Sequence, residues 1–290
     1  GVDDYVSIPA TTSLTSLTDG FSVNFWVNLP TIQNNKEIIS AWGNRGLFLI
    51  TIENGNLNIP LDGPSMGSNI SYSLDNYTSQ WLNVAFTFDN TNKKLYFNGT
   101  LVASTNDAGG PVYDSGTYNG GAIRFGACNS NCGSDFTQLY LDDVGIWNEA
   151  LTSSEITALY NSGSGLSASS NSGDYTSSAN LQGYWNFNEG SGTTLTDQSS
   201  NSNNGTISGA SYATGITGGI ANYASGSGGT TLTFNYTVGV GESSSDLDYV
   251  NTSALSLNSG TIKDAAGNNA TLTLASPGAS NSLGTNKALV

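Results

Sequence analysis

Apolar and polar residues alternate with a period of two along several short segments of the chain. Residues 21–27 place Phe21, Val23, Phe25 and Val27 on one side of an extended strand, and residues 81–88 repeat the pattern. Successive side chains of a strand point to opposite faces, so both segments predict strands with one buried face.

Tight turns separate these segments. The pair Asn98-Gly99 tolerates the positive φ of a type I′ hairpin. Further strands are predicted over residues 37–41, 47–52, 122–125 and 139–147. Many short strands joined by turns predict an all-β sandwich or barrel.

One helix is predicted over residues 152–160. Thr152 and Glu155 have the spacing of a capping box, and Ile156, Leu159 and Tyr160 share one face. We expect this helix to pack across a sheet edge or end.

The residue composition of the chain changes twice after this helix. Residues 164–180 are rich in Ser, Gly and Asn and predict a linker that buries almost nothing. Residues 181–187 resume a strand. From residue 215 onwards, Thr-rich alternation predicts a second, smaller β-sandwich over residues 215–290.

Charge excludes several classes of partner. The chain has 7 Lys and Arg against 22 Asp and Glu, a net charge of −15, and no His. Nucleic-acid binding depends on basic residues that neutralise phosphates, so we expect no nucleic-acid partner.

We also expect no insertion into a membrane, because no apolar run reaches the ~18 residues that a span needs. The missing His excludes Ser-His-Asp and Cys-His catalysis.

The two cysteines, Cys128 and Cys132, lie close together in a polar segment. A local disulfide would indicate an oxidising, extracellular setting, and two reduced surface thiols are the alternative.

Several ordered motifs carry a family resemblance. They are GVDDYVSIP (1–9), DGFSVNFWV (19–27), KKLYFNGTLVAS (93–104) and LDDVGIWNEALTSSEITALY (141–160). Residues 1–163 resemble a laminin G-like or pentraxin-like jelly roll of the concanavalin A-like lectin/glucanase superfamily. Residues 222–274 resemble the tandem immunoglobulin-like repeats of large bacterial surface adhesins, which implies a partial repeat over 215–290.

The order of motifs departs from that family. A segment like LQGYWNFNEGSG usually opens these domains, but here it lies within residues 181–214. Trp185 and Phe187 fall on one face and Tyr184 and Asn186 on the other, so the segment must dock somewhere. It either completes its own sandwich, as in a circular permutation, or pairs with a neighbouring copy through β-strands.

Catalysis is not expected. Glucanases of this superfamily resemble a strand with two Glu around an Asp, and no Glu here has a second acid two residues away on a strand. The resemblance also suggests that Asp142 or Asp143 anchors the sheet edge by hydrogen bonds.

The resemblance to pentraxins implies a calcium site in loops at one end of the sandwich. The matching positions are Asn129, Asn131 and Asp135, with Asn44 contributing from another loop. A disulfide-pinned turn is the alternative. Trp42 and Arg45 are the best candidates for exposed ligand contacts, whereas the other four Trp residues are expected in the core.

These features predict a non-catalytic, extracellular protein of a cell surface or surface filament. Its jelly roll would recognise a carbohydrate or a protein surface, and its function would be adhesion or fibre assembly. The alternatives are a virion structural protein, such as a tail fibre or decoration protein, and a carbohydrate-binding appendage of a secreted glycosidase.

Overall fold

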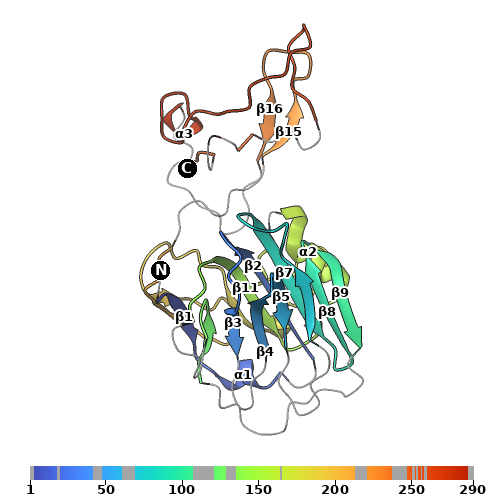
Figure 1. Cartoon of the computed structure of the whole chain (residues 1–290), viewed down its shortest axis with the longest axis vertical. Helices are drawn as coiled ribbons and strands as arrows, with labels where there is room; N and C mark the ends of the chain where they lie inside the picture. The colour runs from blue at the N-terminus through green and yellow to red at the C-terminus, as the bar shows by residue number, and fades with distance from the viewer. Residues whose placement is uncertain are drawn as a thin grey trace. The chain divides into compact units, whose positions relative to one another are not determined.

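A computed structural model describes residues 3–17, 20–41, 48–60, 69–106, 121–128, 135–163, 165–212, 221–236, 247–249, 252, 254–255, 257 and 260–286. The chain divides into two compact units, Gly1–Ala213 and Thr214–Val290. Figure 1 shows the elements of each unit.

Two antiparallel sheets build the first unit. Sheet A has eight strands in the order β13-β14-β1-β10-β3-β4-β5-β6, and sheet B has six in the order β12-β11-β2-β7-β8-β9. The strands are β1 (Tyr5–Ile8), β2 (Phe21–Asn28), β3 (Lys36–Ala41), β4 (Phe48–Glu53), β5 (Asn56–Ile59), β6 (Ile70–Ser73), β7 (Trp81–Phe88), β8 (Asn92–Phe97), β9 (Thr100–Asn106), β10 (Ile123–Phe125), β11 (Tyr140–Trp147), β12 (Leu181–Trp185), β13 (Thr194–Leu195) and β14 (Gly205–Ser208).

The core lies between the two sheets. Phe21 of β2 stacks on Phe48 of β4 with ring centres 5.4 Å apart, and it also contacts Phe86 of β7 at 5.6 Å. All three rings are buried. The predicted all-β sandwich is therefore confirmed, and period-two alternation is the reason that each strand contributes one apolar face.

Helix α2 (Ser153–Tyr160) covers the outer face of sheet B (Figure 1). The predicted capping box is present: Glu155 N–H donates to Thr152 Oγ1 at 3.3 Å, and Thr152 N–H donates to Glu155 Oε2 at 3.0 Å. Ile156 and Leu159 are buried against the sheet. Shorter helical turns not predicted from the sequence are α1 (Thr12–Thr15), η1 (Asn161–Gly163) and η2 (Ser178–Asn180).

Residues 165–180 do more than link two elements. Tyr175 is fully buried, and its hydroxyl accepts a hydrogen bond from Trp147 Nε1 at 3.0 Å and donates one to Ala168 O at 2.9 Å. The prediction that this segment buries almost nothing is wrong. One large aromatic ring is enough to hold a polar segment against sheet B.

Residues 181–208 pair with the sheets of the same chain. Strand β12 pairs antiparallel with β11, and β14 pairs antiparallel with β1. Trp185 is buried in the core, where its ring meets Phe125 edge-on at 5.3 Å. Tyr184 faces the opposite way, into the layer beneath α2. The opposite facing of these two neighbours agrees with the alternation read from the sequence.

The second unit contains strands β15 (Asn222–Ser225) and β16 (Thr233–Asn235), which pair with each other, and α3 (Leu283–Asn286). Among the described residues of this unit, no apolar side chain is buried. The immunoglobulin-like repeat stays a prediction. Across the described part of the whole chain, no helix is long and apolar enough to span a membrane.

Candidate binding surface on sheet A

The outward positions of sheet A form a polar face, defined by the partly exposed Tyr5, Ser7, Arg124 and Glu37 and by Ser40 and Thr51, which are buried. Arg124 lies between Ser7 on one neighbouring strand and Ser40 on the other. The residues that alternate with them, such as Ile8 and Ile123, belong to the core. Alternation along β1, β3, β4 and β10 thus gathers polar groups on one surface.

An aromatic pair lies on the polar face. Tyr5 and Phe136 stack with ring centres 6.1 Å apart and planes inclined by 26°. The guanidinium carbon of Arg124 lies 4.6 Å from the centre of the Tyr5 ring, and Arg124 Nη1 donates to Cys128 O at 2.9 Å. A guanidinium over an aromatic face is an attractive cation–π contact, so Arg124 helps to fix the ring of Tyr5.

A short hairpin beyond β10 brings Phe136 to this place. Cys128 N–H donates to Asp135 O at 3.2 Å, Thr137 N–H donates to Gly126 O at 2.8 Å, and Ala127 is bridged to Phe136. Cys128 is disulfide-bonded, and its predicted partner Cys132 lies outside the described residues.

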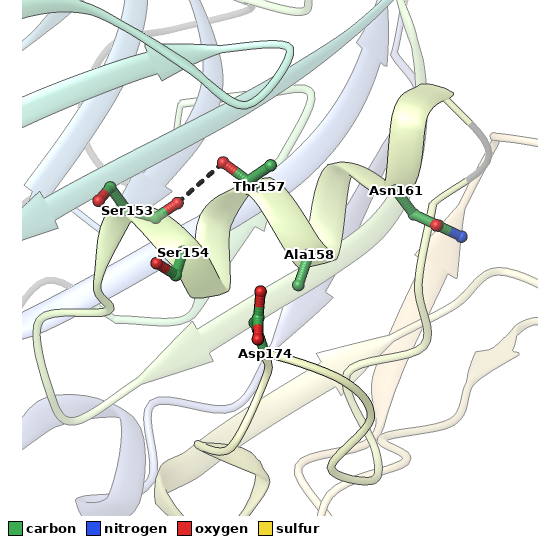
Figure 2. A pocket seen from close by; sticks show the side chains of 6 residues that line it. All are labelled: Ser153, Ser154, Thr157, Ala158, Asn161 and Asp174. Carbon is green, nitrogen blue, oxygen red and sulfur yellow. Dashed lines mark hydrogen bonds between the residues drawn. The ribbon is translucent and has the colours of Figure 1, made fainter.

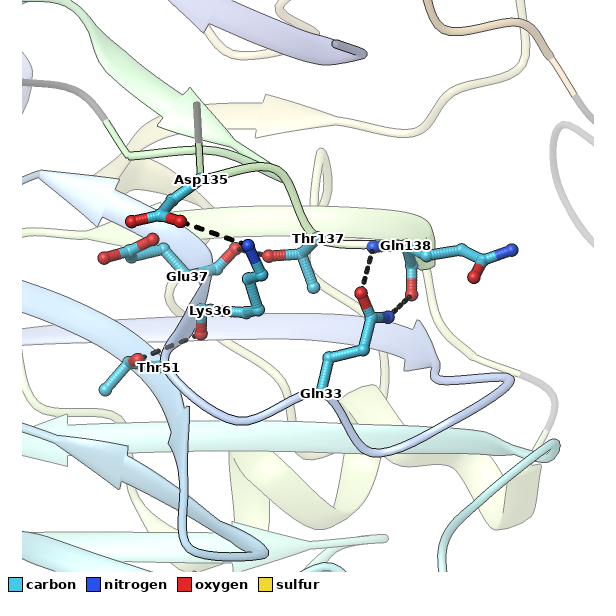
Figure 3. A network of polar contacts seen from close by, with 7 residues as sticks. All are labelled: Gln33, Lys36, Glu37, Thr51, Asp135, Thr137 and Gln138. Atoms are coloured by element: carbon cyan, nitrogen blue, oxygen red, sulfur yellow. Dashed lines mark hydrogen bonds and ion pairs between the residues drawn. The ribbon is translucent and has the colours of Figure 1, made fainter. Parts of the chain in front are cut away.

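Polar contacts tie this hairpin to the start of β3 (Figure 3). Lys36 Nζ forms an ion pair with Asp135 Oδ1 at 3.1 Å, and Thr137 Oγ1 donates to Glu37 O at 2.5 Å. These contacts join residues about a hundred positions apart in the chain and position the hairpin beside the polar face.

Glu37 has an unusual environment. Burial raises the pKa of its carboxyl above 4.5; Asp135 and Glu53 add to the rise, whereas its own backbone N–H and Lys36 oppose it. Its Oε2 is buried without a hydrogen-bond partner. Glu37 is therefore protonated more readily than an exposed glutamate.

Most of the predicted ligand residues lie outside the described part of the chain. They are Trp42, Asn44, Arg45, Asn129 and Asn131. Asp135 is described, and its carboxylate is occupied by Lys36. Within the described residues, no group of three or more His, Cys, Asp or Glu could hold a metal ion. The calcium site stays a prediction.

A pair of adjacent carboxyls lies in sheet B. The Tyr184 hydroxyl donates to Asp143 Oδ1 at 2.5 Å and so links β11 to the edge strand β12, while Asp143 N–H donates to Asp142 Oδ1 at 2.9 Å. Asp143 adopts a φ of +47° at an irregularity in the pairing with β2. The contact with Tyr184 agrees with the predicted anchoring of the sheet edge.

Burial raises the pKa of both carboxyls. The pKa of Asp142 rises to about 8, because burial is reinforced by the charge of Asp143. Burial raises the pKa of Asp143 to about 6, and the hydrogen bond from Tyr184 limits that rise. At neutral pH the pair therefore retains a proton.

An open hollow of about 340 Å³ lies beside α2 (Figure 2). Its lining is more polar than apolar and consists of Ser153, Ser154, Thr157, Ala158, Asn161 and Asp174. No aromatic ring is among these lining residues, so the hollow offers no flat apolar surface comparable to the Tyr5–Phe136 pair.

Sequence reasoning did not single out Tyr5, Phe136 or Arg124. Tyr5 alternates with the buried Val6 and Ile8, which marks it as outward-facing. Arg124 carries the same signal, because it alternates with the buried Ile123 and Phe125. Phe136 carries none, and the meeting of the three residues depends on the pairing of β1 with β10 and on the hairpin that follows β10.

Comparison with known proteins identifies the first unit. The family model described as the concanavalin A-like lectin/glucanases superfamily (Laminin_G_3) matches residues 1–157. A search of curated proteins gave no match.

One solved structure shares the fold over part of its length, and a second has a lower similarity. A candidate carbohydrate-binding protein from Bacteroides ovatus is 17% identical with a TM-score of 0.54; the match covers 71% of this chain and 56% of that one. The binding domain of botulinum neurotoxin serotype G is 22% identical with a TM-score of 0.45, and the match covers 54% of this chain and 40% of that one. The chain therefore spans less than two thirds of each of these proteins.

Proposed function

Because this chain belongs to the Laminin_G_3 family of the concanavalin A-like lectin/glucanase superfamily, we propose that its first unit is a non-catalytic carbohydrate-binding module. The proposed binding surface is the polar face of sheet A around Tyr5. The observation that carries the proposal is the stacked Tyr5–Phe136 pair with Arg124 beside it.

The chemistry of this surface suits a sugar. A pyranose has an apolar C–H face that packs on an aromatic ring, and hydroxyls at its rim that both donate and accept hydrogen bonds. Tyr5 and Phe136 are each partly exposed and offer the rings, while Ser7 and Arg124 offer polar groups on adjoining strands. Aromatic rings with a polar rim are typical of ligand-binding surfaces.

Binding is favoured over cleavage by the state of the nearby acids. Glycoside hydrolysis generally uses two carboxyls about 5–9.5 Å apart that flank the scissile bond. Here Asp135 forms an ion pair with Lys36, and Oε2 of Glu37 is buried. These two groups do not form a pair of accessible carboxyls across a sugar-binding surface, so we favour binding over cleavage.

We place the module in an extracellular protein that acts in surface adhesion or filament assembly. The disulfide at Cys128 supports an oxidising compartment. The description of the Bacteroides ovatus protein with this fold supports carbohydrate as the ligand. Pairing with identical subunits through β-strands stays a prediction.

Calorimetric titration with a panel of neutral and acidic oligosaccharides tests the proposal. Tyr5→Ala and Phe136→Ala should each weaken binding about threefold to tenfold, the loss expected for one aromatic contact. Tyr140→Ala is the matched control, since Tyr140 is an exposed ring on sheet B.

If none of the oligosaccharides binds, the proposed ligand class is wrong and a protein partner is favoured. Binding that survives both substitutions at full strength would place the sugar elsewhere on the module.

A further inference from the structure

A short strap of chain, residues 165–168, lies over the carboxyl pair of sheet B. It follows α2 and begins at Gly165, whose φ is +68°. A Cβ added at Gly165 would lie 3.4 Å from Asp143 Oδ2 and 3.4 Å from Trp26 Nε1. Ala168, at the other end of the strap, is buried. The strap thus covers Asp143 closely at a position that suits glycine.

The Tyr184 hydroxyl connects the pair to the strap. It donates to Asp143 Oδ1 at 2.5 Å, and it is hydrogen-bonded to the Ser167 side chain and the Ala168 backbone. One hydroxyl therefore joins three elements: β11, β12 and the strap. A change of charge at Asp143 acts directly on the group that holds the strap.

No basic side chain among the described residues is recorded in contact with either carboxyl. The groups facing the pair are Tyr184 from β12, Trp26 from β2, and Tyr160 from α2, whose ring stacks on that of Trp26 at 5.8 Å. Negative charge on the pair is thus balanced only by hydrogen bonds. Two adjacent carboxylates without a cationic partner are costly even in a partly buried site.

We propose that ionisation of the Asp142–Asp143 pair lifts the strap from sheet B and that protonation closes it. In the closed state the pair keeps a proton and stays covered. Lifting the strap exposes the Asp143 carboxylate more fully to water and uncovers the stacked rings of Trp26 and Tyr160. The module is therefore tightest in acid, and local opening grows with pH until both carboxyls are also ionised in the closed state.

The strap is the element that yields because it belongs to neither sheet. Gly165 N–H donates to Tyr160 O at 3.3 Å and Leu166 N–H donates to Leu159 O at 3.0 Å. The strap also accepts hydrogen bonds at Gly165 O from Asn161 Nδ2 at 2.8 Å and at Ala168 O from the Tyr175 hydroxyl at 2.9 Å. Strand β12, the other element beside the pair, is fixed by its ladder with β11 and by the buried Trp185. Local opening favours a segment that has no strand ladder to break.

Hydrogen exchange read by mass spectrometry between pH 5 and pH 9 tests the proposal on the whole chain, after correction for intrinsic exchange. Peptides from residues 163–170 should lose protection as pH rises from 5 to 8, and their protection should then level off. Within that window the opening equilibrium should increase about tenfold per pH unit for each proton released on opening. Peptides from β2 and β7 should keep their protection.

Asp143→Asn should flatten this pH dependence, whereas Asp75→Asn, a change at an exposed turn, should leave it intact. If Asp143→Asn fails to fold, the pH dependence of the wild-type strap still tests the proposal, and Asp142→Asn should reduce that dependence. Constant protection of the strap from pH 5 to 8, or the same loss in β2 and β7, would overturn the proposal.

Discussion

The Thr11 hydroxyl donates a hydrogen bond to Asn203 Oδ1 at 2.6 Å and so joins residues near opposite ends of the first unit. Asn203 is buried, and its Nδ2 donates to Ser13 Oγ at 3.1 Å and to Gln182 O at 2.8 Å. One amide therefore fixes α1 to the segment that contains β12.

Asn203→Ala should lower the free energy of unfolding by about 2–4 kcal/mol, because it removes the three side-chain hydrogen bonds of a buried amide. Urea unfolding followed by tryptophan fluorescence measures the change. The exposed Asn188→Ala should cost less than about 0.5 kcal/mol. Equal effects of the two changes would show that Asn203 holds nothing together.

Gly183→Ala should be destabilising because its added methyl group would collide with the ring of Trp185, which lies across the glycine. Overpacking of this kind costs about 1–3 kcal/mol. Trp185→Leu alone should also destabilise, since it empties part of the core. The double variant should be more stable than the sum of the two losses predicts, and additivity in thermal unfolding would contradict the contact.

Glu155 should make the first unit sensitive to acid. Burial by itself raises the pKa of Glu155, but hydrogen bonds from Ser177, Thr152 and Thr176 outweigh burial and lower the pKa below 4.5. The folded state therefore gains stability from ionised Glu155 above pH 4.5, and this gain is lost as pH falls through the lowered pKa.

Unfolding measured at pH 7 and pH 3 checks this effect. Glu155→Gln should destabilise the protein at pH 7 and make little difference at pH 3. Asp174→Asn, a change at an exposed residue that lines the hollow beside α2, is the control. A Glu155→Gln penalty of the same size at both pH values would rule out this carboxylate as the cause.

Calcium should raise the thermal midpoint of the protein if Asp135 belongs to the predicted site. A ligand that binds only the folded state stabilises it by mass action, so chelation should lower the midpoint. Asp135→Asn should remove the response to calcium, and Glu53→Gln should not. A midpoint indifferent to both calcium and chelator would end the metal proposal.

Short sequence patterns predicted the strands and the helix whose formation depends on residues close together in the chain. Alternation over residues 21–27 gave β2, and the spacing of Thr152 and Glu155 gave the start of α2. The burial of Tyr175 could not be predicted, because one aromatic residue within a Ser-, Gly- and Asn-rich segment forms no periodic pattern. Its burial depends on Trp147 and on the open face of sheet B, which no local pattern describes.

The candidate surface depends even more on distant contacts. Tyr5, Arg124 and Phe136 come from two separate parts of the chain and meet through strand pairing. Nothing in the spacing of the three residues indicates this meeting. The raised pKa values at Asp142 and Asp143 likewise depend on what covers them, which is a property of the folded layer above sheet B.

The position of β1 between β14 and β10 sets an order on biosynthesis. A nascent chain whose emerged portion stops short of β12 has β1 with one neighbour and β11 without its outer partner. Residues 181–185 cover the edge of β11 first, and the edge of β1 stays open until the ribosome has delivered residues 205–208. Open strand edges of this kind can pair with other chains during synthesis.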